Sequence, residues 1–207
     1  MKSTPCSAAA SCLGVMLALS LAGCGSSGSN PQFSGLTQLQ QGGVVGKVEL
    51  PTGDTAQGGH GETIDGIVSE IPQTGYHIHA HLSLYVNGQQ IAIPEAIGIV
   101  NPINEQNGFV EEGDSFYWLH THDATGIIHV EAPGPGTYTL GQFFDIWGQP
   151  LSSTNVAGFQ GPVTAMVQGL PYTGDLRAIT FIPHQQITLE VGTPVVTPPL
   201  YAFPPDY

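Results

Sequence analysis

The chain has 207 residues, with only three Lys and Arg against sixteen Asp and Glu, and a formal net charge of −13. So few cations exclude nucleic-acid binding, which depends on many phosphate contacts, and anionic lipid would repel this surface. All three cysteines, Cys6, Cys12 and Cys24, lie within the first 24 residues. The rest of the chain therefore has no disulfide, thiolate metal site or cysteine nucleophile, and it is long enough for one domain with a substantial core.

The N-terminus has the pattern of a signal peptide. Lys2 is followed by an apolar run, Leu13 to Ala22, that is too short for a permanent membrane span. The run ends in Leu21-Ala22-Gly23-Cys24, which resembles the lipobox of bacterial lipoprotein precursors. This resemblance implies cleavage before Cys24, lipid attached at Cys24, and export to a cell membrane or outer membrane that holds the protein by its acyl chains. An ordinary signal peptide with an incidental Cys24 remains the alternative.

Composition divides the remainder into three parts. Residues 24–43 are rich in Gly, Ser and Gln and predict a flexible tether. Residues 44–192 predict a single His-rich β domain. The Pro-rich residues 193–207 predict a tail that lies extended over the surface.

The domain is predicted to be mostly β. His77 to Val86 alternates apolar and polar residues, and Asn87-Gly88 is typical of a tight hairpin turn before a returning strand. The expected strands cover residues 44–50, 77–86, 89–94, 115–122, 127–131, 163–169, 178–182 and 187–192. Thr139 and Gln142 have the spacing of a capping box and predict one short helix near residues 140–147. Many short strands with Gly and Pro turns favour an antiparallel β-sandwich or a small barrel.

Six of the eight histidines fall in three of these strand segments. Side chains at alternate positions share one face of a strand, about 6.6 Å apart, so two imidazoles can converge on one ion. An HxH pair with a third histidine from a neighbouring strand is a common zinc or copper site. The predicted metal ligands are His77, His79, His81, His120, His122 and His129.

The position of His129 depends on the register of the hairpin around residues 123–126. A four-residue loop would pair His120 with His129 and gather three histidines on one face. A turn with a bulge at Gly126 would shift the register by one and turn His129 away. We favour the first register, because it segregates polar from apolar side chains.

Other polar residues have more than one interpretation. Glu131 and Asp123 could bind the metal or orient a liganding imidazole through its other nitrogen. For Asp123 we favour turn capping. We expect His60 to be exposed and His184 to be a turn residue. The aromatic residues expected in the core are Trp118, Phe143, Phe144 and Trp147.

The ligand types limit the metal. A blue-copper site requires a cysteine, so it is excluded. An all-imidazole set with acidic neighbours suits Zn²⁺ or Cu²⁺, and the sequence does not separate the two.

Three strings, HIHAHLSLYVNGQQIAIPEAIGI, WLHTHDATGIIHVEAP and YTLGQFFDIWGQPL, resemble a group of exported bacterial proteins without an established activity. The resemblance covers residues 76 to 192 and implies a shared β-rich domain. Copper-zinc superoxide dismutases, α-type carbonic anhydrases and cupins also use HxH motifs, but the spacing here matches none of them.

These observations support three hypotheses. The first is a lipid-anchored protein that binds copper or zinc through His79, His81, His120 and His122, with His129 and His77 completing the set, for metal capture, tolerance or delivery. The second is a zinc-dependent hydrolase or lyase with three histidine ligands and Glu131 or Asp123 as base. The third is a structural or interaction lipoprotein without metal. Protein partners are not predicted.

Overall fold

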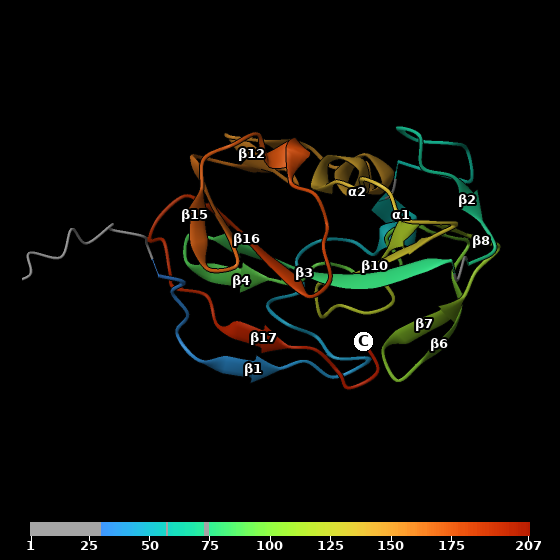
Figure 1. Ribbon diagram of the computed structural model, residues 1–207, viewed down its shortest axis with the longest axis horizontal. Coiled ribbons are helices and arrows are strands. Elements are labelled where there is room, and N and C mark those ends of the chain that lie inside the picture. Colours follow the sequence, from blue (N-terminus) through green and yellow to red (C-terminus); the bar gives the residue numbers. More distant parts are fainter. Residues whose placement is uncertain (1–29, 57, 73–74) are drawn as a thin grey trace, which may run out of the picture.

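The computed structural model describes residues 30–56, 58–72 and 75–207 (Figure 1). The predicted signal peptide, Cys24 and the first part of the predicted tether lie outside these residues. The described chain consists mostly of strands in several sheets, with short helices, and none of its sheets closes into a barrel. The predicted mostly-β class is therefore confirmed, whereas the small-barrel alternative is wrong.

The largest sheet has seven strands in the order β15-β14-β16-β3-β10-β9, with β4 also paired to β3. Their bounds are β3 Tyr76–Val86, β4 Gln89–Ile91, β9 Leu119–His120, β10 Ile127–Ala132, β14 Val163–Val167, β15 Leu170–Tyr172 and β16 Gln185–Val191. Strands β3 and β16 run parallel, and the other pairs of this sheet are antiparallel. The predicted antiparallel pairing therefore holds for five of the six pairs of this sheet, and the pair of β3 with β16 is the exception.

Smaller sheets and helices surround this sheet. Strand β1 (Leu36–Gln38) pairs in parallel with β17 (Leu200–Ala202), and β6 (Ile103–Gln106) forms a hairpin with β7 (Phe109–Glu112). Two three-stranded sheets consist of β2 (Ser69–Glu70), β8 (Ser115–Tyr117) and β5 (Ile99–Val100), and of β11 (Leu151–Ser152), β12 (Asn155–Val156) and β13 (Phe159–Gln160). The helices are α1 (Gly53–Ala56), α2 (Leu140–Trp147) and the 3-10 helix η1 (Leu176–Ala178). Figure 1 shows β3 and β10 in a middle layer, with α2 on one side and β1 and β17 on the other.

Helix α2 begins and ends where the sequence predicts. The Thr139 side chain accepts from the backbone N–H of Gln142, and the Gln142 side chain accepts from the backbone N–H of Thr139, so the capping box is confirmed. Phe143, Phe144 and Trp147 are fully buried in the main core. Trp118 is only half-buried, because its indole N–H reaches the Glu70 carboxylate.

Three predicted strands are absent or divided. Residues 44–50 make only single bridges, at Val44 and Lys47, and Gly46 turns the chain between them with a φ of 105°. Of residues 178–182, the first ends η1 and the others make one bridge, at Thr180. Residues 115–122 divide into β8 and β9, which belong to different sheets. Apolar content alone does not show whether a partner strand lies alongside.

The segments predicted as tether and tail meet through β1 and β17. The Gln186 side chain accepts from the backbone N–H of Tyr201 at 2.9 Å and donates to its carbonyl at 2.8 Å. These buried hydrogen bonds hold β17 against the face of β16 that carries Gln186. The residues after β17 continue from there toward the β6–β7 hairpin (Figure 1).

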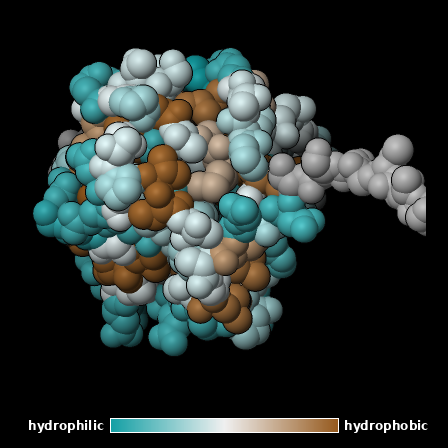
Figure 2. Space-filling model, turned by 90° about the vertical axis from the view of Figure 1, so that its left-hand side faces the viewer, coloured by the Kyte–Doolittle hydropathy of each residue, from teal (hydrophilic) through white to brown (hydrophobic). Residues whose placement is uncertain are grey.

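The surface alternates between polar and apolar areas. In Figure 2 hydrophobic atoms form several small areas separated by hydrophilic ones. Large exposed apolar side chains include Leu36, Ile71 and Val195. Within the part of the chain that the structure describes, no helix has the length and hydropathy needed to cross a membrane.

Candidate metal centre

Three adjacent strands bring the predicted histidines onto one face of the large sheet. His129 of β10 lies directly opposite His120 of β9 and, on its other side, directly opposite His79 of β3. Glu131 lies opposite His77 in the same way. The predicted pairing of His120 with His129 is confirmed. The bulged register is wrong, although Gly126 does have a positive φ of 88°.

The opposite face of the same strands explains this register. Ile78, Ala80, Ile128 and Val130 alternate with the histidines and are buried in the main core. A slip of one residue would move the imidazoles into that core and expose the aliphatic side chains. Burial of these four aliphatic side chains therefore places the histidines together on the opposite face of the sheet.

His122 does not continue the ladder, because β9 ends at His120. The carbonyl of His122 accepts from the backbone N–H of Val110 at 2.8 Å, and its ring Nδ1 lies at hydrogen-bond distance from the Val110 carbonyl. These two contacts turn His122 toward β7. The loop is thus longer than the four residues predicted.

The hydrogen bonds of His120 and His122 determine which ring nitrogens carry protons. His120 Nδ1 lies 2.8 Å from the Tyr117 carbonyl, and His122 Nδ1 contacts the Val110 carbonyl. A carbonyl oxygen only accepts, so each Nδ1 must be the protonated nitrogen. In the neutral rings both Nε2 atoms then carry lone pairs, and these atoms are 3.1 Å apart. Two facing lone pairs repel each other unless a cation or proton lies between them.

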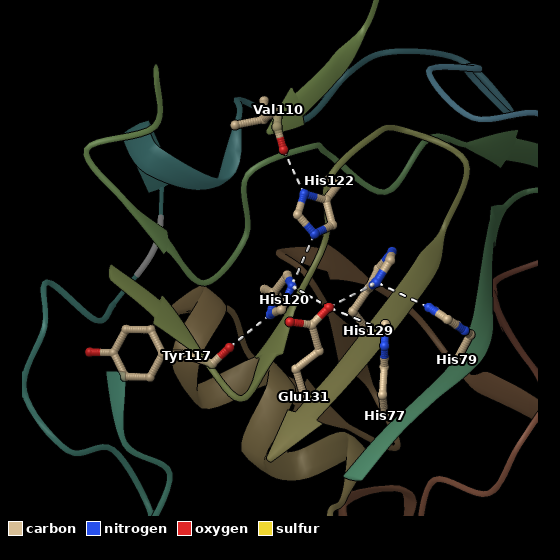
Figure 3. A network of polar contacts seen from close by, with 8 residues as sticks. All are labelled: His77, His79, Val110, Tyr117, His120, His122, His129 and Glu131. Atoms are coloured by element: carbon tan, nitrogen blue, oxygen red, sulfur yellow. Dashed lines mark hydrogen bonds and ion pairs between the residues drawn. The ribbon is translucent and has the colours of Figure 1, made fainter. Parts of the chain in front are cut away.

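Glu131 adds a negative oxygen to the same place (Figure 3). Its Oε1 lies 3.2 Å from His77 Nε2, 3.7 Å from His129 Nδ1 and 3.9 Å from His120 Nε2. The side chain is 13% exposed. One carboxylate oxygen thus faces three imidazole nitrogens in a largely dry environment.

Two groups of side chains have ligand atoms within 4.8 Å of one another. The first, the histidine–carboxylate group, consists of His120, His122, His129 and Glu131. The second, the three-histidine group, consists of His77, His79 and His129. Zinc–nitrogen bonds of about 2.0–2.1 Å in a tetrahedron separate the ligand atoms by about 3.3–3.4 Å. The contacts of 3.1–3.9 Å within the histidine–carboxylate group are close to that spacing, so small side-chain movements would complete this site. In the three-histidine group, His79 Nε2 and His129 Nδ1 are 3.2 Å apart.

Burial keeps the imidazoles in the form that binds metal. Burial lowers the pKa of His79 to about 3, with a further contribution from the neighbouring His77. Burial also lowers the pKa of His120 and of His129 well below the usual value, and that of His122 less. These rings are therefore neutral near pH 7, and a neutral imidazole offers a lone pair to a metal ion.

Other residues of the predicted set lie elsewhere. His81 is fully buried, lies 2.9 Å from the Thr125 carbonyl through Nε2 and stacks on Tyr201, outside both groups. Asp123 accepts from the backbone of Gly42 and Thr125, as a turn cap does.

His60 and His184 lie on the surface. Both are exposed, and His184 has a positive φ of 56° in a turn. Neither belongs to the two groups.

Two aromatic residues that the sequence did not indicate cover the site. The Tyr207 ring lies 4.4 Å from that of His79 and 5.3 Å from that of His129. Phe109 stacks on His122 at 4.6 Å. Both come from segments distant in sequence, the C-terminal residues and the β6–β7 hairpin, so no local pattern could have revealed them.

Three surface hollows of the described chain, of about 360, 220 and 380 Å³, have no ligand residue in their lining. Val110, whose carbonyl contacts His122, lines the first, and Phe109, which stacks on His122, lines the second. No protein-family model matches the chain, and neither does any curated protein or solved structure. The function must therefore be argued from the site alone.

Proposed function

We propose that this is an exported protein, anchored by lipid at Cys24, that binds Cu²⁺ or Zn²⁺ through His120, His122, His129 and Glu131. Its role would be metal capture, tolerance or delivery at the cell envelope. The ligand set consists of three imidazoles and one carboxylate, all of which suit these ions.

The observation that carries the proposal is the convergence of His120 and His122. Their Nδ1 atoms donate to carbonyl oxygens, and their unprotonated Nε2 atoms are 3.1 Å apart in a partly buried place. Carbonyl groups that hold the other nitrogen of a liganding imidazole are a common feature of metal sites. A bound cation would replace the repulsion of two lone pairs by two coordinate bonds.

A metal-binding role is favoured over the zinc-hydrolase alternative by the position of Glu131. A hydrolase needs three ligands, an open position for water and a separate base. Here Glu131 Oε1 lies among the imidazole nitrogens as a fourth candidate ligand, which closes the set. Glu131 also lines none of the three hollows described above.

The test is a titration of the metal-free full chain, purified without a histidine tag, with Cu²⁺ and separately with Zn²⁺ at pH 7.5. We expect one tightly bound ion and a rise in melting temperature, because binding free energy adds to folding. The double variant His120→Ala, His122→Ala should lose about 100-fold or more in affinity, since even groups that only orient ligands contribute 10–100-fold.

Two further variants keep this test decisive. His120 is fully buried, so the double variant loses packing, and its metal-free melting temperature is measured first. Glu131→Gln keeps the shape but removes the charge and should also weaken binding. His60→Ala removes an exposed histidine outside both groups and should bind as wild type does. Wild-type affinity in a folded double variant would overturn the proposal.

A further inference from the structure

We propose that the two ligand groups are successive positions of one ion. The three-histidine group receives the ion from solvent and passes it to the histidine–carboxylate group. This proposal rests on the metal-binding function proposed above and describes how the ion enters and leaves.

The exposure of the side chains gives the direction. The His77 side chain is 43% exposed, whereas those of His129 and His120 are 7% and 1% exposed. Tyr207 lies against His79 and His129, and Phe109 lies against His122. An arriving ion therefore meets His77 first among the ligand residues.

Shared residues connect the two positions. His129 belongs to both groups, and its Nδ1 lies 3.2 Å from His79 Nε2 and 3.7 Å from Glu131 Oε1. Glu131 Oε1 also lies 3.2 Å from His77 Nε2 (Figure 3). An ion at the three-histidine group thus already has ligands of the second group beside it. It can move by ligand exchange without ever losing all of its ligands.

The same sharing favours one ion over two. His129 Nδ1 has a single lone pair, so it cannot bind two ions at once through that atom. Two divalent cations this close would also repel each other strongly. During the exchange, bonds from His77 and His79 break as bonds from His120, His122 and Glu131 form. Each liganding nitrogen needs a free lone pair, so a ring whose proton lies on that atom must pass it to its other nitrogen or to solvent, and no electron is transferred.

The experiment compares metal uptake and release in the full chain with and without His77. Cu²⁺ is mixed rapidly with the metal-free protein, and quenching of tryptophan fluorescence reports uptake. Excess EDTA then reports release, and metal analysis gives the stoichiometry. The variant is His77→Ala, which removes an exposed side chain and should not disturb folding. His60→Ala is the matched control, because it removes an exposed histidine outside both groups.

We expect His77→Ala to slow both uptake and release of the ion by about tenfold. This is the lower end of the loss in metal affinity or activity when a group that supports a metal site is removed. The Kd should change less than the two rates, because the loss of an intermediate position alters the barrier, whereas the bound ion keeps all of its ligands; the contact of His77 with Glu131 at 3.2 Å is the part of the end state that is lost. His60→Ala should leave both rates as in wild type.

Other results would overturn the proposal. Faster release with weaker affinity would make His77 an ordinary ligand of the bound ion. Unchanged rates would place it off the path, and two tightly bound ions would make the groups independent sites. Each of these leaves metal binding standing, whereas a wild-type chain that binds no Cu²⁺ would remove both proposals.

Discussion

Asp123 accepts hydrogen bonds from the backbone N–H of Gly42 at 2.8 Å and of Thr125 at 3.1 Å, and from the Thr125 hydroxyl. It is 2% exposed, and burial raises the pKa of its carboxyl group. These contacts join the loop that carries His122 to the chain near Gly42. Asp123, which follows the candidate ligand His122 in the chain, therefore fixes the shape of this loop.

This role gives a prediction at the scale of one residue. Asp123→Ala should lower the free energy of unfolding by about 3 kcal/mol, because buried donors lose a charged acceptor. Urea denaturation measures this loss. The Kd for Cu²⁺ of the folded variant should stay close to that of wild type.

Asp123→Asn is the matched control, since it keeps a side-chain oxygen that can accept from Thr125. It should lose less stability than Asp123→Ala. A stable Asp123→Asn variant that binds copper as weakly as Glu131→Gln would show instead that Asp123 is a ligand.

At the scale of elements, β17 determines what covers the histidine face. It pairs only with β1, a strand of three residues, so the backbone ladder between them is short. Two hydrogen bonds between the Gln186 side chain and the Tyr201 backbone, the stacking of Tyr201 on His81 and the hydrogen bond from the Gln90 amide to the Tyr201 hydroxyl add to its attachment. Tyr207, which lies against His79 and His129, follows a few residues later.

Removal of this attachment should loosen the C-terminal segment. Gln186→Ala should lower the free energy of unfolding by about 2 kcal/mol, because two buried hydrogen bonds to the backbone are lost. Limited proteolysis with chymotrypsin should also cut after Tyr201 sooner than in wild type. Urea denaturation and mass spectrometry of the fragments measure both effects.

Gln160→Ala, an exposed residue of β13, is the control and should change neither quantity. If the Gln186→Ala chain is cut no faster than wild type, β1 and the contacts of Tyr201 are sufficient to hold the segment.

At the scale of the whole molecule, the buried imidazoles make the metal-free fold sensitive to acid. Five of them have a lowered pKa in the folded state, mainly through burial: His79, His81, His120, His122 and His129. In the unfolded chain each would titrate near pH 6.5. Below that pH the unfolded chain binds protons that the folded chain does not, so stability is lost as the pH falls.

Buried carboxyl groups act in the opposite direction. Burial raises the pKa of Asp123 and of Glu190, so the folded chain holds their protons more readily and gains stability as they protonate. They are fewer than the histidines, and an unfolded carboxyl group titrates only near pH 4. Between pH 7 and 5 the histidines therefore dominate.

We expect the free energy of unfolding of the metal-free protein to fall steadily from pH 7.5 to pH 5. Each imidazole that stays neutral at pH 5 should contribute up to about 2 kcal/mol to this loss. Urea denaturation at several pH values measures it. His81→Gln should flatten the dependence, whereas His60→Ala should leave it unchanged. A stability independent of pH over this interval would contradict the predicted burial of neutral imidazoles.

Local patterns in the sequence predicted much of the element that carries the site. The alternation in residues 76–86 and the Asn87-Gly88 turn predicted β3 and its return to β4, and Asn87 and Gly88 have φ values of 49° and 79°. The separation of apolar from polar residues also predicted that His120 pairs with His129. These features depend on neighbours in the chain and on the need to bury one face, both of which are visible in the sequence.

Only the tertiary structure decided which histidines meet. His79 and His81 are both histidines on the same face of β3. However, His79 lies opposite His129, whereas His81 lies opposite Ile127 and stacks on Tyr201. The difference comes from β10 and β17, which are far away in the chain. The order of the strands and the parallel pairing of β3 with β16 depend on packing of the whole core. The apolar face of one strand does not by itself specify which strand lies beside it. The sequence by itself therefore determined that imidazoles would share a face, and long-range packing determined which of them converge with Glu131.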